Sequence, residues 1–420
     1  MAQPLSLFLF QLALVLFAAK VGAEICQRYL KQPPVLGELA MGMLIGPYAL
    51  GGIPIPGIGP LFPLVASQSG PVVQNPVSNE LYIIAQVAVI VLLFSAGLGT
   101  DFRQFFRFAG PASVVAIGGA IISFGLGLAA ALLFGVANSF ASTEALFAGA
   151  IISATSTGIT ARILKDIGKL GTPEGITTLA ADVIDDVLGI LTLTVILGLT
   201  IGSAFDPLAA LASVGKALGF WLALIAIGLV TAKFISRFII SFQVVGAAVA
   251  LALALAFFSG GLAEKFGLAT VIGAYSIGLA LSNTKLASIL AKPIETVHHL
   301  FVPIFFVVMG MLFDFRAMGD VIIFGLVISI LAILGKLLGC GLPALGIGFN
   351  VRGAMRIGFG MVPRGEITLI IAGIGLTRGL IPREIFGVAV MVIMVTTVLS
   401  PIVLSYLFKK GGEGRRKPES

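Results

Sequence analysis

The sequence predicts an all-α polytopic membrane protein, and three observations support this. Of the 420 residues, 58% are hydrophobic and only 11% are charged, whereas a soluble domain carries about 25% charged residues. Apolar segments long enough to cross a bilayer as helices follow one another along nearly the whole chain. Short glycine motifs recur in two halves of the chain. We therefore expect one helical bundle with thirteen transmembrane helices and no soluble domain.

Each predicted transmembrane helix is an apolar run between polar or glycine-rich and proline-rich connections. The runs are residues 4–27, 33–50, 80–100, 110–136, 143–165, 172–201, 209–235, 243–263, 267–282, 292–313, 319–346, 353–377 and 382–408. The runs 33–50 and 267–282 are short for a full crossing.

The basic residues predict the orientation. Alternate connections and the C-terminal tail hold 18 of the 26 lysines and arginines, while the other connections hold five. By the positive-inside rule the basic set is cytoplasmic, so the C-terminus lies inside. Thirteen crossings then place the N-terminus outside.

The two halves form a predicted inverted repeat. Gly37 and Gly42 recur as Gly273 and Gly278 in similar surroundings, and Gly97 before 101–102 recurs as a glycine before 314–315. The members of the last pair fall on opposite sides of the membrane. Six helices therefore oppose six, with 209–235 as the linker, and inverted repeats are typical of transporters.

Two predicted helices are interrupted near their middles, each the fifth of its half. One contains the Ser/Thr-rich run 153–160, and the other contains 358–366 with Pro363. Proline and glycine weaken helices, and hydroxyl groups offer the backbone other partners. Matching interruptions indicate a midplane site where freed carbonyls bind cations. A simple proline kink and close packing of small residues are the alternatives.

Five charged residues lie inside apolar segments: Asp185, Asp186, Lys336, Arg364 and Glu366. If all faced lipid, insertion would cost about 2.5–3.5 kcal/mol each, about 12–18 kcal/mol together. They must instead face one another, water or an ion. Neighbouring residues on a helix point about 100° apart, so one aspartate can face an ion while the other meets Lys336.

The aspartate pair predicts cation/proton exchange. A carboxyl group removed from water binds a proton, whereas a bound cation favours its ionised form. One site thus holds either a proton or a hard cation bound by oxygen ligands. Lys336 can take part by releasing its proton when the ion takes its partner, and a static salt bridge is the alternative.

Other polar residues leave alternatives open. Arg364 and Glu366 either neutralise half-helix ends or contact the ion directly. Asp182, one turn before Asp186, is either part of an inward funnel that attracts cations or a solvated acid of the cavity wall. His298 and His299 lack a second ligand set for a metal. No cofactor and no nucleic-acid partner are expected; the expected partners are monovalent cations, protons and the lipid bilayer.

Together these residues resemble the monovalent cation/proton antiporter-2 family, most closely its bacterial sodium/proton antiporters. The motifs that carry the resemblance are Ala154-Thr155-Ser156-Thr157-Gly158-Ile159-Thr160-Ala161-Arg162, Val183-Ile184-Asp185-Asp186-Val187-Leu188-Gly189, Ile333-Leu334-Gly335-Lys336 and Val362-Pro363-Arg364-Gly365-Glu366. The resemblance spans essentially the whole chain, and the combination of these motifs in this order is highly specific. Asp182 departs from the pattern of the close bacterial members, which have a small residue there.

The resemblance implies a core domain with two crossed, unwound helices, a dimerisation domain, a homodimer and an elevator motion. The implied division is 1–108 dimerisation helices of the first repeat, 109–203 core helices of the first repeat, 204–240 linker helix, 241–317 dimerisation helices of the second repeat, 318–408 core helices of the second repeat and 409–420 cytoplasmic tail. It also implies the inner membrane of a bacterium, with an internal membrane such as a thylakoid as the alternative.

The resemblance further implies roles for single residues. Asp186 corresponds to the essential ion-binding aspartate, and Asp185 to the aspartate that pairs with Lys336 and joins Asp186 at the Na+. Thr155, Ser156 and Thr157 are candidate further ion ligands. The Asp-Asp pair with a lysine is the pattern of electrogenic members.

The predicted function is therefore secondary active exchange of Na+, or Li+, for H+, rather than enzymatic catalysis. The potassium-efflux branch of the family is the alternative. An intramembrane aspartyl protease also buries two aspartates, but it needs them on facing helices rather than adjacent on one. A bile-acid-type symporter shares the general architecture, yet nothing indicates a large organic pocket beside the charged residues.

Overall fold

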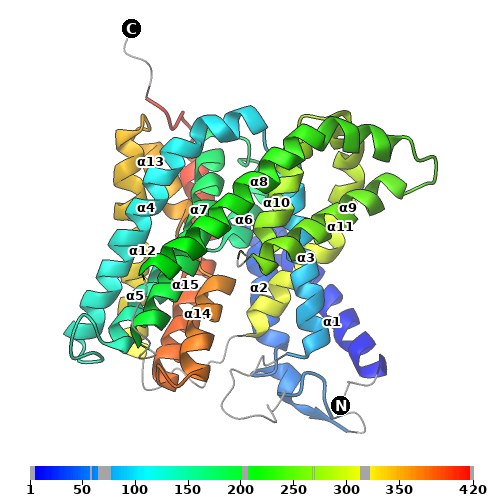
Figure 1. The fold of residues 1–420 in the computed structure, drawn as a ribbon. Coiled ribbons are helices and arrows are strands. Elements are labelled where there is room, and N and C mark those ends of the chain that lie inside the picture. Colours follow the sequence, from blue (N-terminus) through cyan, green and yellow to red (C-terminus); the bar gives the residue numbers. More distant parts are fainter. Residues whose placement is uncertain are drawn as a thin grey trace.

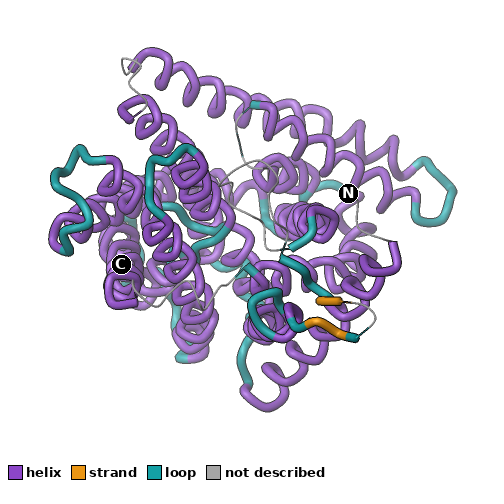
Figure 2. Tube along the Cα trace, turned by 90° about the horizontal axis from the view of Figure 1, so that it is seen from below, coloured by secondary structure: helices purple, strands orange, loops and turns teal. Residues whose placement is uncertain are grey.

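The computed structural model describes residues 5–56, 59–64, 77–200, 207–266, 268, 270–312 and 322–416. Almost all of these residues are helical, and the helices form one bundle (Figure 1). In Figure 1 α1 begins at the lower end of the bundle, and the described part of the C-terminal tail lies at the upper end. The only strands among the described residues, β1 (Pro54–Ile55) and β2 (Gly59–Pro60), pair as a short antiparallel hairpin (Figure 2).

The helices of the first half are α1 Leu5–Ile25, η1 Cys26–Leu30, α2 Pro34–Ile45, η2 Leu50–Gly52, α3 Asn79–Leu98, α4 Phe102–Leu133, α5 Thr143–Ser153, α6 Thr157–Asp166 and α7 Pro173–Thr200. They are followed by α8 Pro207–Ile240, α9 Ala247–Lys265, α10 Thr270–Leu281, α11 Lys285–Met311, α12 Ile322–Gly346, α13 Val351–Gly360, α14 Glu366–Thr377 and α15 Arg383–Lys409.

Each of the thirteen predicted segments coincides with one helix or with two half-helices. Ten helical stretches in the described ranges are long and apolar enough to cross a membrane, and two more, 270–281 and 367–376, are apolar but shorter. The chain is thus an all-helical, multi-pass membrane protein. The predicted boundaries were wrong where a helix continues past its apolar run: α4 begins at Phe102 rather than 110, and α11 at Lys285 rather than 292. Charged residues such as Arg103 mark the edge of the apolar region and do not end a helix.

The helices pack in two groups. On one side α1 packs on α2, α2 on α11, and α3 on α10 and α11, with α9 against α10. On the other side α4 packs on α12, α5 and α7, while α15 contacts α12, α13 and α14. The long helix α8 crosses diagonally in front of both groups in Figure 1. Contacts between the groups include those of α6 with α2 and α3.

Glycines set the closest contacts, and these contacts come in matching pairs. A Cβ on Gly42 of α2 would strike the backbone of α11 near Gly310, and a Cβ on Gly278 of α10 would strike the backbone of α3 near Gly97. In the same way Gly118 of α4 and Gly339 of α12 each leave room only for the other's backbone. Four of the repeated glycines, Gly42, Gly97, Gly278 and Gly310, thus make equivalent close contacts in the two halves. The 314–315 member of the predicted repeat lies outside the described residues.

Candidate functional site

Both predicted interruptions are real, and they lie against each other. The break between α5 and α6 covers 154–156, and the break between α13 and α14 covers 361–365. The backbone N–H of Ser156 donates to the carbonyl of Pro363 at 2.9 Å, and the Thr160 hydroxyl donates to the carbonyl of Gly360 at 2.8 Å. Gly365 packs directly on the Ser156 side chain. Both breaks are shorter than the predicted stretches. The first one ends early because helix α6 already begins at Thr157.

Arg364 ties the two breaks together from inside. Its side chain is fully buried and donates to the carbonyls of Met361 at 3.0 Å, Ile152 at 2.7 Å and Ala332 at 3.2 Å. Ile152 lies in the last turn of α5, and Met361 follows the end of α13, so the guanidinium sits at two helix C-termini. A cation is favourable at that position because helix C-termini carry partial negative charge. The side chain of its predicted companion, Glu366, lies outside the described residues.

Asp185 is held by three bonds on α7, facing the first break. Lys336 of α12 donates to its Oδ1 at 2.8 Å, and the ammonium and carboxylate are 0% and 2% exposed. The backbone N–H and the hydroxyl of Thr155 both donate to Oδ2, at 2.9 and 2.6 Å. Gly119 of α4 makes room for the lysine, since a Cβ there would lie 3.3 Å from its Nζ and would overlap Cys340. The predicted pairing of Asp185 with Lys336 is present in the geometry.

Asp186 points to a different partner. Its Oδ2 accepts from the Thr157 hydroxyl at 3.1 Å, at the start of α6, and the residue is 2% exposed. The two aspartates therefore divide the first break between them: Thr155 bonds Asp185 and Thr157 bonds Asp186. Two of the three residues predicted as further ion ligands thus contact the aspartate pair, while Ser156 bonds the second break through its backbone.

Asp182 is fully buried one turn before this pair, and neither of its carboxylate oxygens has a hydrogen-bond partner among the described residues. The nearby Thr155 hydroxyl gives its single proton to Asp185. Because Asp182 has no accessible surface, the alternative of a solvated acid of the cavity wall is wrong for this conformation, whereas its place in an inward funnel stays a prediction.

A second ion network, not predicted from the sequence, joins the two helix groups. Arg162 of α6 bonds Glu38 of α2 at 3.0 Å and Asp166 of its own helix at 2.8 Å, and Arg162 and Glu38 are both nearly inaccessible. Arg162 also stacks over the ring of Phe306 from α11. Arg162 lies in α6, within the predicted segment 143–165, but no partner was predicted for it. Glu38 was missed although it stands in an apolar segment, which is the signal that identified Asp185.

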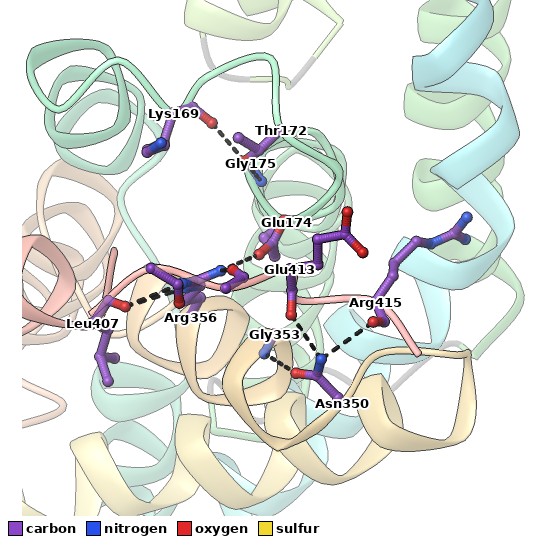
Figure 3. A network of polar contacts seen from close by, with 12 residues as sticks. Lys169, Thr172, Glu174, Gly175, Asn350, Gly353, Arg356, Leu407, Glu413 and Arg415 are labelled. Atoms are coloured by element: carbon purple, nitrogen blue, oxygen red, sulfur yellow. Dashed lines mark hydrogen bonds and ion pairs between the residues drawn. The ribbon is translucent and has the colours of Figure 1, made fainter. Parts of the chain in front are cut away.

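A third network of polar contacts joins the C-terminal tail to α13 and to the start of α7 (Figure 3). Arg356 of α13 bonds Glu174 at the start of α7 at 2.8 Å and donates to tail carbonyls, including that of Gly411 at 2.8 Å. Asn350 caps α13 through Gly353 and donates to the carbonyls of 413 and 415. This network fixes the first turn of α7, the helix that carries the aspartates.

Buried, oppositely charged groups at two facing helix breaks define a membrane transporter for small ions, because such groups inside a bundle mark ion pathways. The model of the family "Sodium/hydrogen exchanger, transmembrane" matches residues 13–410. The chain belongs to this family and is a secondary transporter, a cation/proton antiporter, rather than an enzyme, which removes the aspartyl protease alternative.

Relatives that match this chain over almost their full length have names that agree with this family. The chain is 35% identical to the Na(+)/H(+)-K(+) antiporter GerN of Bacillus cereus, with 96% of each chain covered. It is 30% identical to a Na(+)/H(+) antiporter of Enterococcus hirae, covering 96% of this chain and 98% of that one. The fold matches that of the sodium proton antiporter MjNhaP1 from Methanocaldococcus jannaschii with a TM-score of 0.72 and 21% identity, over 99% of this chain and all of the other.

Proposed function

We propose that the protein exchanges Na+, or Li+, for H+ across the membrane, and that Asp186 is the residue on which cation and proton compete. The observation that carries this proposal is the buried Lys336–Asp185 pair beside Asp186 at the meeting point of two broken helices. Asp186 offers an oxygen ligand set together with Thr157, and monovalent hard cations prefer oxygen. When no cation is bound, a proton neutralises the buried carboxyl group.

The Lys336–Asp185 pair makes exchange sensitive to membrane potential in this proposal. While Lys336 bonds Asp185, the pair is neutral as a whole. A cation that binds Asp185 as well as Asp186 displaces the ammonium, and a buried ammonium without a counter-ion releases its proton readily. More than one proton would then leave for each Na+ that enters, so exchange moves net charge.

Alternating access requires the site to face each side in turn, and we assign this to an elevator motion. The proposed core is 109–203 with 318–408, and the proposed dimerisation domain is 1–108 with 241–317, joined by the linker helix 204–240. The separate packing of the two helix groups and the matched glycine contacts support this division and the inverted repeat. We further propose thirteen crossings, an N-terminus outside, a cytoplasmic C-terminus, a homodimer and a bacterial plasma membrane.

The substrate is the finer part of the proposal. GerN is named for both Na+ and K+, so potassium/proton exchange, as in the potassium-efflux branch, is the second candidate. A pH-gradient dye assay in proteoliposomes compares Na+, Li+ and K+, with the membrane potential clamped or free. We expect Na+ and Li+ to collapse the gradient faster than K+, and we expect Asp186→Asn to abolish this response. Cation flux without proton flux would refute the proposal, as would wild-type rates in the variant.

A further inference from the structure

A cavity of about 500 Å³ lies at the end of the bundle that we propose to be cytoplasmic. Three separate parts of the chain form it: the turn after η1, the loop between α6 and α7, and the last turn of α15. Its polar walls carry lysines and glutamines, while Pro33, Pro34, Ile167 and Phe408 line it with apolar surface. The cavity thus offers positive charge beside apolar walls.

The charge in this cavity is not balanced. Lys31, Lys169 and Lys409 each come from a different segment. The ammonium groups of Lys31 and Lys169 have no acceptor in the described ranges, and that of Lys409 bonds a single backbone carbonyl, Lys31 O at 3.2 Å. The one acid in the wall, Asp166, already accepts from Arg162 with both oxygens, at 2.8 and 3.0 Å. Like charges that converge without a counter-ion repel one another.

The backbone conformation at Lys31 helps to shape this cavity. Lys31 has φ of 53°, and it is the only non-glycine residue in the described ranges with a positive φ. This conformation is uncommon for a residue with a Cβ. It turns the chain between η1 and α2 so that the carbonyl of Lys31 faces Lys409.

We propose that this cavity binds the phosphate of an anionic phospholipid headgroup. The phosphate of a phospholipid carries its negative charge on two non-ester oxygens arranged tetrahedrally with two ester oxygens, and each non-ester oxygen can accept from more than one ammonium group, so one phosphate can meet lysines from three segments. Basic pockets between transmembrane helices on the cytoplasmic side bind anionic headgroups. The apolar wall formed by the two prolines, Ile167 and Phe408 suits the glycerol and the first methylenes of a lipid.

The bound headgroup would bridge parts of the proposed moving and static domains. Lys31 follows η1 in the proposed dimerisation domain, Lys169 belongs to the proposed core, and Lys409 directly follows the last core residue at the end of α15. An anion between them replaces repulsion with attraction and stabilises the conformation described here. The inference concerns binding and does not depend on the proposed transport activity.

The test is native mass spectrometry of the purified full-length protein titrated with dioctanoyl phosphatidylglycerol. Parallel titrations use dioctanoyl phosphatidylcholine and inorganic phosphate. One variant carries Lys31→Gln, Lys169→Gln and Lys409→Gln. Its matched control carries Lys→Gln at the exposed positions 233, 285 and 292, which removes the same charge elsewhere.

We expect one tightly bound phosphatidylglycerol in the wild type and in the control. Each lysine near a membrane surface contributes about five-fold to the affinity for anionic lipid, so the triple variant should bind about a hundred-fold more weakly. Binding by the triple variant within two-fold of the control would overturn the proposal. If the triple variant does not fold, Lys169→Gln alone should weaken binding about five-fold. If inorganic phosphate binds in a lysine-dependent way and the lipid does not bind, the cavity is a phosphate site whose ligand is free phosphate, and the lipid part of the proposal is overturned.

Discussion

Replacing Lys336 by methionine tests whether the Lys336–Asp185 pair stabilises the fold. Methionine keeps an unbranched apolar chain but removes the ammonium group. Breaking a fully buried ion pair from one side costs about 3–5 kcal/mol, because the remaining charge loses its partner. Asp185 keeps its two bonds to Thr155, which lessen the cost. We therefore expect a loss of stability near the lower end of this range, about 3 kcal/mol at neutral pH.

The assay is equilibrium unfolding in mixed micelles of the single variants, Lys336→Met and Asp185→Asn, and of the double variant. Two residues in direct contact are not independent, so the double variant should lose about 2 kcal/mol less than the sum of the single losses. Lys292→Met, at an exposed position, should change stability by less than about 0.5 kcal/mol. Additive losses in the double variant would refute the reasoning, because they would mean that the two charges do not stabilise each other.

Three further predictions follow from the same contacts. Thr155→Val removes the hydroxyl bond to Asp185 but keeps the backbone bond, so we expect it to cost about 1.5–3 kcal/mol in unfolding measurements; an unchanged midpoint would contradict the bond. Glu38→Gln leaves Arg162 with Asp166 alone and should destabilise the protein, whereas Glu24→Gln, at an exposed ion pair, should not. Gly42→Ala places a methyl group against the backbone of α11 and should cost about 1–3 kcal/mol, while Gly261→Ala, with open space around it, should cost less.

The sequence predicted the helices well because a bilayer imposes a length and a polarity on each crossing. It also located both breaks, since Pro363 and the Ser/Thr run are local signals. It could not predict how the breaks meet. The bond from Ser156 to the carbonyl of Pro363 joins residues more than two hundred positions apart, and no periodicity along the chain encodes that contact. The ion pair of Lys336 with Asp185 was predicted only because few charged residues stand inside apolar segments.

Residues at the ends of helices were harder to interpret. The basic residues entered the sequence analysis mainly as counts that gave the orientation, and a charge count does not distinguish a solvated residue from one that is buried by tertiary packing. Arg162 is buried because Glu38 and Phe306 arrive from other helices. The sequence predicts only a polar tail at residues 410–416, yet the side chains of Arg356 and Asn350 donate hydrogen bonds to its carbonyls. Every residue has the same backbone carbonyl, so the sequence does not indicate which carbonyls accept these bonds.

The helix α6 connects two of these networks. Its first residue, Thr157, bonds Asp186. Its last turns contain Arg162, which bonds Glu38 of α2, and Asp166, which bonds Arg162. Ten helical residues span about 15 Å, and α6 contains no proline or break. We therefore expect this short, unbroken helix to move as one piece. If a cation binds at Asp186 as proposed and displaces Thr157, we expect the Arg162 guanidinium that joins the two helix groups to shift as well, and a change at Glu38 to affect the aspartate pair in turn.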